Sequence, residues 1–210
     1  MTKVQEKEAE LVAGKRMQKL TTDDIKDHRE YERERDEFRR RIIEMKKRRR
    51  VRLGDLMTIT FENTDTMRFQ IQEMARAERM LSDEQIAHEV ETYNELIPGA
   101  CELSGTLFIE IDDKEKLYEW LPQLVGIQRA VKARLRDGTE VPSIPEDEER
   151  LTREETTSTV HYLKFRFEPD QCQEFAGGPA WIVVDHPAYQ AETELTDAQH
   201  SELAEDLAAT

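Results

Sequence analysis

Two histidines lie within the most apolar stretches of the chain, where an imidazole is an unusual side chain. His161 lies inside "STVHYLKFRFE" (158–168), and His186 follows the apolar run "AWIVV". With Glu73 or Asp185 as a carboxylate, they would make a donor set that suits zinc, iron or manganese. The sequence has no H-E-x-x-H or E-x-x-H motif. A metal site therefore requires the fold to bring these distant residues together.

Two other interpretations of these polar residues stay open. Glu73 could form an ion pair with Arg76 or Arg79, and the histidines could be hydrogen-bonded parts of the core. Alternatively, Arg76 and Arg79 could bind an anion or a small molecule, because planar guanidinium groups suit carboxylates and phosphates. The candidate ligand-binding residues are Glu73, Arg76, Arg79, Asp185 and Tyr189, and the candidate metal ligands are His161, His186 and Glu73.

Several catalytic classes lack their motifs in this sequence. There is no G-x-S-x-G, no G-x-x-x-x-G-K-[ST] and no G-x-G-x-x-G, which argues against a serine hydrolase, a P-loop enzyme and a dinucleotide-binding fold. The two cysteines, Cys101 and Cys172, are 71 residues apart and form no C-x-x-C pair. This spacing argues against a disulfide framework, a cysteine zinc site and an iron–sulfur cluster held by this chain alone. Whether the protein is an enzyme stays open.

The elements that must position these residues follow from the hydrophobic periodicity. Steps of three, four and seven predict a long helix over about 23–48, and two further helices follow over 66–81 and 82–93. Alternation with a period of two predicts strands, which cover 51–53, 57–61, 106–112, 158–168 and 180–184, with a hairpin around "RDG" at 136–138. We expect an α+β fold, with the long N-terminal helix and the helical pair packed on a largely antiparallel sheet. A short helix capped by "TDAQ" should end a single domain over 17–210, preceded by a loosely held extension, 1–16.

The stretch "FRRRIIEMKKRRRVRLG" (38–54) carries a local charge of +8 in a chain whose net charge is −15. Its apolar positions step by three and four and then by two, which is typical of a helix that leads into a strand. We therefore expect Phe38, Ile42, Met45, Val51 and Leu53 to be buried, Arg39, Arg40 and Lys47 to reach water, and some of Arg41, Arg48, Arg49, Arg50 and Arg52 to meet carboxylates of the same fold or of a second subunit. Nucleic-acid binding through 39–52 and a nuclear import signal are the alternatives.

The composition favours a cytoplasmic protein. The N-terminus lacks the apolar region of a secretory signal, and the longest apolar run, at 180–184, is far shorter than the roughly 20 residues of a membrane span. The acidic total repels bulk DNA and RNA. We expect no membrane partner, and a homo-oligomer is compatible with the sequence.

Four blocks of the sequence, "FENTDTMRFQIQEMARAER", "YNELIPG", "STVHYLKF" and "VDHPAY", resemble one bacterial family, the domain-of-unknown-function family 3501. The likeness runs from about Met17 to Leu203. Members of the family are often encoded beside rubrerythrin-like and iron–sulfur oxidoreductase proteins. The resemblance thus implies an accessory or binding protein in the cytoplasm that acts with redox or oxidative-stress partners. A metal-dependent enzyme or metal carrier that uses His161, His186 and an acidic residue is the rival hypothesis, and nucleic-acid binding is the third.

Overall fold

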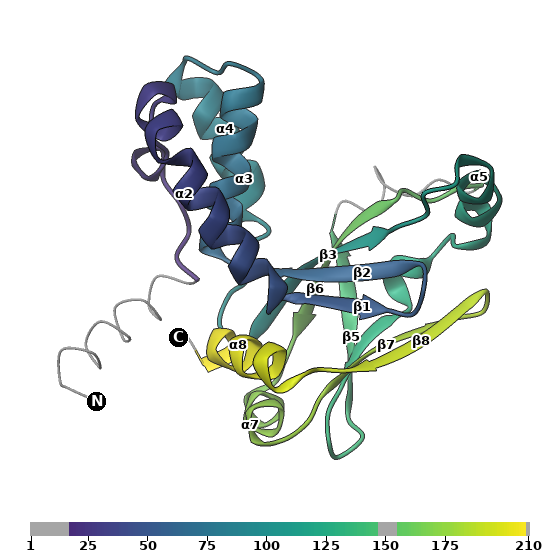
Figure 1. The fold of residues 1–210 in the computed structure, drawn as a ribbon. Coiled ribbons are helices and arrows are strands. Elements are labelled where there is room, and N and C mark those ends of the chain that lie inside the picture. Colours follow the sequence, from purple (N-terminus) through teal and green to yellow (C-terminus); the bar gives the residue numbers. More distant parts are fainter. Residues whose placement is uncertain (1–16, 147–154, 209–210) are drawn as a thin grey trace.

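Eight strands form one antiparallel sheet in the order β1-β2-β3-β6-β5-β4-β7-β8. The computed structural model describes residues 17–146 and 155–208. The strands are β1 (Arg50–Leu53), β2 (Met57–Glu62), β3 (Glu102–Ile109), β4 (Val131–Arg134), β5 (Glu140–Glu146), β6 (Val160–Arg166), β7 (Trp181–His186) and β8 (Tyr189–Glu194). The sheet curls until its outermost strands, β1 and β8, come into contact (Figure 1). The result is an antiparallel, nearly closed barrel in a mixed helix–strand fold.

The inner face of this barrel is apolar because alternate side chains along each strand point inward. On β2, Met57, Ile59 and Phe61 belong to the buried core. Phe61 lies against Phe165 of β6, with 6.0 Å between ring centroids. His161 has the same parity on β6 as Phe165, and it is buried. The inner face of β6 therefore carries His161, Leu163 and Phe165.

Side chains, and not a backbone ladder, join β1 to β8. The Tyr189 hydroxyl donates to the Leu53 carbonyl oxygen at 2.7 Å and accepts from the Leu56 N–H at 3.1 Å. The Thr193 hydroxyl donates to the Arg52 carbonyl at 2.7 Å. Gln199, which follows β8, donates to the Arg50 carbonyl at 2.7 Å. We call these three residues the seam side chains.

Gly54 makes this seam possible at the β1–β2 turn. Its φ of +62° lies in the left-handed region that favours glycine. A Cβ atom at this position would lie 2.3 Å from the Tyr189 hydroxyl oxygen. Only glycine therefore lets the turn approach Tyr189 this closely.

Three helices form an arm that projects from one end of the barrel (Figure 1). They are α2 (His28–Lys47), α3 (Thr64–Ala77) and α4 (Asp83–Asn94). The arm has its own apolar core, which consists of Leu20, Met67, Ile71, Val90, Leu96 and Ile97. Tyr162 of β6 is the partly buried strand residue that packs against this core.

The expectation that these helices lie on the sheet is wrong. The apolar stripe of α2 is narrow, with only Tyr31 and Ile42 buried, and α3 packs between α2 and α4. The helices of the arm therefore bury their apolar side chains mainly against one another. Helix α2 also begins later than expected, because Asp27 caps it and the preceding Thr22–Asp24 forms a separate 3-10 turn, η1.

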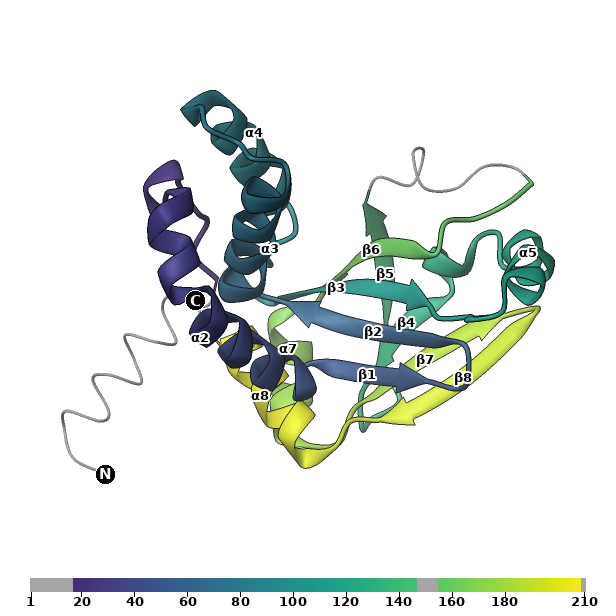
Figure 2. The same ribbon diagram turned by 45° about the horizontal axis from the view of Figure 1, so that its top comes forward.

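Three further α-helices and a 3-10 turn, η2 (Ile127–Arg129), complete the described chain: the helices are α5 (Lys114–Gln123), α7 (Pro169–Gly177) and α8 (Asp197–Ala208). Helices α7 and α8 pack against each other below the end of α2 (Figure 2). None of the described helices is both long and apolar enough to cross a lipid bilayer. The expected extension, 1–16, lies outside the described residues.

The basic segment 38–54 is confirmed as the joint between α2 and the sheet. Ile42, Val51 and Leu53 are buried, whereas Phe38 and Met45 are partly buried. The expected solvent-facing residues, Arg39, Arg40 and Lys47, are exposed. Strand β1 begins three residues after α2 ends, at the point where the apolar period changes.

Most of the remaining arginines of the joint meet carboxylates. Arg49 is fully buried, and its guanidinium contacts Glu202 and Asp206 of α8. Two carbonyl groups accept its other hydrogen bonds, those of Phe61 at 2.9 Å and Glu62 at 3.2 Å. Further ion pairs join Arg48 to Glu202, Arg50 to Glu110 and Arg41 to Asp65. Arg52 instead donates to the carbonyls of Gly54 and Asp55.

Candidate functional site

The two histidines lie in separate local hydrogen-bond networks. His161 Nε2 is 3.0 Å from both the Thr157 hydroxyl oxygen and the Ser158 carbonyl oxygen. His186 Nε2 is 3.0 Å from the Val125 carbonyl oxygen, and its Nδ1 accepts from the Ala188 N–H. Because a carbonyl can only accept, His186 must be the neutral tautomer with its proton on Nε2. This arrangement matches the interpretation of both histidines as hydrogen-bonded structural residues.

Glu73 has partners other than those expected. It accepts two hydrogen bonds from Arg35, each at 2.7 Å, and one from the Tyr31 hydroxyl at 2.7 Å. The expected pairing with Arg76 or Arg79 is therefore wrong, because α2 runs alongside α3 and brings Arg35 to this face. Arg76 instead pairs with Glu32, at 2.8 Å and 3.3 Å.

The ion pair shifts the titration of its members. The hydrogen bond from Arg35 holds the pKa of Glu73 below its ordinary value, against a smaller opposing effect of burial. Burial, and then the hydrogen bond to Glu73, raise the pKa of the Tyr31 hydroxyl well above its ordinary value. Glu73 is thus an ionised structural partner that joins α2 to α3.

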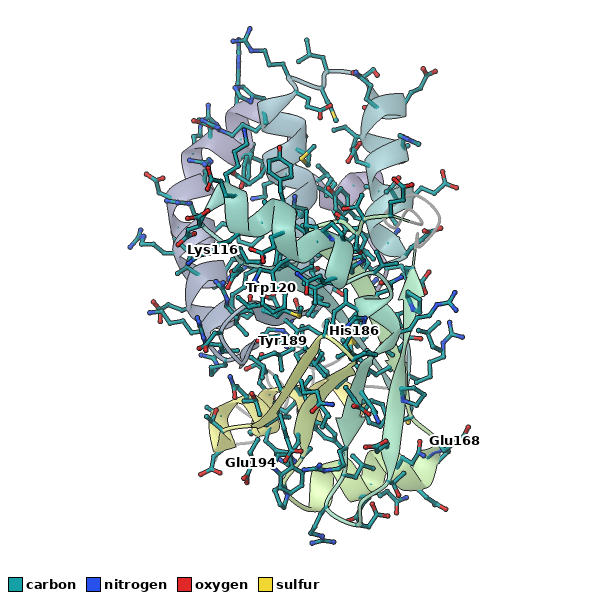
Figure 3. The ribbon with its side chains drawn as sticks, turned by 90° about the vertical axis from the view of Figure 1, so that its right-hand side faces the viewer. Lys116, Trp120, Glu168, His186, Tyr189 and Glu194 are labelled. Carbon is teal, nitrogen blue, oxygen red and sulfur yellow. The ribbon has the colours of Figure 1, made fainter. Side chains whose placement is uncertain are left out.

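The last two candidates lie on the β7–β8 hairpin. Asp185 pairs with Lys132 at 3.2 Å on the exposed face of the barrel. Tyr189 is a seam side chain, and Trp120 of α5 packs against its ring edge-on at a centroid distance of 6.4 Å (Figure 3). Across the described residues, no three His, Cys, Asp or Glu side chains form a group that could hold a metal ion. The predicted ligand-binding residues thus fall into two places, with Arg76 and Arg79 on the arm and Asp185 and Tyr189 on the barrel.

One end of the arm, which lies away from the barrel in Figure 1, holds a hollow of about 190 Å³. It is bounded by the turn η1, the first residues of α2, the end of α3 and the start of α4. Its apolar lining consists of Ile25, Tyr31, Ala75, Met80, Leu81 and Ile86. Its charged lining includes Lys26, Asp27, Arg76 and Asp83, with His28 beside them. The hollow continues into a surface depression lined by His28, Arg76, Ala77, Arg79, Met80 and Leu81.

Arg79 occupies a position that usually belongs to glycine. After the C-cap Glu78, the Met80 N–H donates to the Ala75 carbonyl and the Arg79 N–H donates to the Arg76 carbonyl. This pattern is a Schellman motif, in which the residue after the cap takes the left-handed conformation. Arg79 does so with φ +53°. The guanidinium of Arg79 has no hydrogen-bond or ion-pair partner among the described residues.

Leu81 is the exposed apolar residue of this surface, with 87% of its area accessible. It precedes Ser82, the N-cap of α4, and Ile86 stands at the fourth position of that helix. A residue in the place of Leu81 commonly packs against that fourth position as a hydrophobic staple. The sequence "LSDEQI" carries this signal, but Leu81 is directed toward solvent instead. Sequence reasoning found Arg76 and Arg79 but missed His28, Met80 and Leu81, which complete the surface. We call Arg79, Met80 and Leu81 the arm tip.

Comparisons with known proteins agree with the resemblance noted in the sequence. The family described as "Protein of unknown function (DUF3501)" matches residues 19–207. A crystal structure of a novel protein of unknown function from Burkholderia pseudomallei K96243 is 32% identical. The alignment covers 90% of this chain and 100% of that chain, with a TM-score of 0.84. A comparison with curated proteins gave no match. The chain therefore belongs to the DUF3501 family of proteins of unknown function.

Proposed function

We propose that this protein is an accessory protein that binds a partner protein through the arm tip. The observation that carries the proposal is the conformation of Arg79. A residue other than glycine in the left-handed region costs about 1–2 kcal/mol, yet the strained position holds a long cation that has no partner among the described residues. Strain of this kind is common where a side chain is held ready for a ligand.

The neighbours of Arg79 define the chemistry of the partner. Leu81 and Met80 supply apolar contact area, and Leu81 is almost wholly exposed. The surface depression is lined by two arginines, Arg76 and Arg79, and by no carboxylate among its described lining. Apolar residues beside arginine are typical of the centre of a protein interface. We therefore propose that the partner presents a carboxylate next to an apolar side chain.

The position of the arm favours a partner of large size. The arm tip lies away from the barrel (Figure 1), so a bulky protein can approach it without meeting the barrel. The net negative charge of the chain would slow the approach of an acidic partner, and this repulsion is strongest at low ionic strength. At 0.1 M salt, exposed charges act only over a Debye length of about 10 Å. Once bound, the partner's carboxylate would face Arg79 directly.

The cellular role is part of the same proposal. Because members of the family are often encoded beside rubrerythrin-like and iron–sulfur oxidoreductase proteins, we propose a cytoplasmic partner of that redox class. The association names a class of partner and no reaction. Its support is the family membership together with a surface suited to protein binding.

Site-specific photo-crosslinking tests the proposal. A photoreactive residue replaces Leu81 in the full chain, and a second variant carries it at Ile43, an exposed apolar position on α2. After irradiation in cells of the source organism, position 81 should give a crosslinked partner that position 43 does not give. Arg79→Gly, added to the position 81 variant, should remove that product.

Three outcomes would reject the proposal. The first is equal crosslinking from both positions, and the second is a product that persists with Arg79→Gly. The third is turnover of a small molecule by the purified protein alone, with a rate that Arg79→Gly and Leu81→Ser leave unchanged. If a partner is found, mass spectrometry of the product decides whether it belongs to the redox class.

A further inference from the structure

The fold brings together the two cysteines that are far apart in the sequence. Strands β3 and β6 pair so that Glu102 faces Arg166, and the register continues one residue further, where the Phe167 N–H donates to the Cys101 carbonyl at 2.8 Å. Helix α7 then starts at Pro169, and its first turn bonds the Cys172 N–H to the Glu168 carbonyl. This first turn of α7 places Cys172 near the start of β3, where Cys101 lies.

The Cys101 side chain acts electrostatically on the Cys172 thiol. Both side chains pack against the barrel core, and both are partly buried. Neither is in a disulfide. Cys101 has φ +53°, in the left-handed region, a strained conformation for a residue other than glycine. The strained backbone places Cys101 at the turn between the arm and the barrel, opposite α7.

We propose that Cys101 and Cys172 are a reversible dithiol–disulfide pair, a redox modification site whose oxidant is a hydroperoxide. The Cys101 thiolate attacks one oxygen of hydrogen peroxide, the O–O bond breaks, and the other oxygen leaves as water after taking a proton. Cys101 is then a sulfenic acid. The Cys172 sulfur attacks the Cys101 sulfur, the S–O bond breaks, and a second water leaves with the thiol proton. In sum, two thiols and one peroxide become one disulfide and two waters.

The environment assigns the two roles. Burial, and then the interaction with Cys101, raise the pKa of the Cys172 thiol to about 12. Cys172 therefore keeps its proton at neutral pH and is a weak initial nucleophile. Cys101 is the attacking residue and Cys172 the resolving one. The two cysteines look unrelated by their spacing in the chain, because the sequence does not show that α7 folds back on β3.

Oxidation would connect the segment that follows the arm to helix α7. Cys101 follows the segment that leaves α4, whereas α7 packs on α8, which holds Arg49. A disulfide here would close a loop that contains the hairpin of β4 and β5. Closure of a long loop restricts the unfolded chain and should raise the unfolding temperature. The inference is independent of partner binding at the arm tip.

The experiment uses the full-length, reduced protein with one equivalent of hydrogen peroxide. Intact mass spectrometry should show the loss of two hydrogen atoms per chain, both thiols should become unreactive to a thiol reagent, and dithiothreitol should restore them. Cys172→Ser should stop at the sulfenic acid, which dimedone traps at Cys101. Cys101→Ser should leave Cys172 reduced at the same peroxide dose. If a serine variant does not fold, Cys101→Ala and Cys172→Ala repeat the test. Formation of the disulfide itself is measured on the wild-type protein alone.

Three results would overturn the proposal. The first is that wild-type protein retains both thiols under a dose that oxidises free glutathione completely. The second is a disulfide that forms only between chains, seen as a dimer on a non-reducing gel. Equal dimedone labelling of Cys101 and Cys172 in the single variants would reject the assignment of attacking and resolving residues.

Discussion

The guanidinium of Arg49 donates a hydrogen bond to the carboxylate of Asp206, and neither side chain is exposed to solvent. The two residues are 157 positions apart, so this contact attaches the C-terminal helix α8 to the joint between α2 and β1. Glu202, one turn earlier on α8, accepts a hydrogen bond from the same guanidinium at 3.2 Å. Removal of one partner from such a network leaves a buried charge without compensation.

Arg49→Met should therefore destabilise the protein strongly. Loss of one member of a buried ion pair typically costs about 3–5 kcal/mol, and urea unfolding followed by circular dichroism measures it. Arg39→Met is the matched control, because Arg39 is exposed on the same basic segment, and it should change stability by less than about 0.5 kcal/mol. Similar small effects of both substitutions would show that the segment is not packed as described.

Tyr189→Phe should open the seam between β1 and β8. The variant loses both the donor to the Leu53 carbonyl and the acceptor for the Leu56 N–H. A buried polar group left without its partner costs about 1–3 kcal/mol. Hydrogen exchange of the amides in 50–56 should accelerate, whereas Tyr118→Phe, on an exposed tyrosine of α5, should leave it unchanged. Unaltered exchange in Tyr189→Phe would mean that the seam holds without this hydroxyl.

Arg79→Gly should stabilise the fold while it removes partner binding. Glycine adopts the left-handed conformation without a steric penalty, so the free energy of unfolding should rise by about 1 kcal/mol. Thermal unfolding measures the change, and Glu78→Gly, one residue earlier with φ −89°, should destabilise instead. A loss of stability in Arg79→Gly would show that the arginine contributes to packing and is not held under strain.

The pair of Glu73 and Arg35 should make stability fall in acid. The pKa of Glu73 is lowered in the fold from its ordinary value of 4.5, so its contribution is fully present above about 4.5 and is lost as the pH falls through the lower, folded value. The difference in unfolding free energy between wild type and Glu73→Gln should therefore shrink below pH 4.5. Urea titrations from pH 7 to pH 3 measure it. A difference in unfolding free energy that stays constant over this pH range would show that the ionised Glu73 side chain does not stabilise the fold.

The sequence predicted the joint at 38–54 well, because its apolar period changes from a helical to a strand spacing within one segment. It also predicted the strand around His161, where alternation is strong. It missed β8, whose "YQAETE" alternates between partly buried and exposed residues and carries no strong apolar side chain. The partner of Glu73 was also missed, because Arg35 lies on another helix and no local spacing reports on how two helices align.

The arm tip and the cysteine pair show a second limit. Arg79 looked like an ordinary helical arginine, because its left-handed conformation depends on where α3 ends, and helix boundaries are poorly determined by sequence patterns. Cys101 and Cys172 looked unrelated for a similar reason. Their proximity follows from the β3–β6 register and the turn into α7, and both are tertiary properties.

The seam side chains have a consequence for how the protein behaves at high concentration. The edge strand of an open sheet offers free carbonyl and N–H groups that can recruit a strand from another molecule, the first step toward aggregation. On β1, the carbonyl groups of Arg50, Arg52 and Leu53 already accept hydrogen bonds from Gln199, Thr193 and Tyr189. These hydroxyl and amide groups cap the edge without extending the sheet. The barrel thus resists strand addition by other chains even though its backbone hydrogen bonding stops short of full closure.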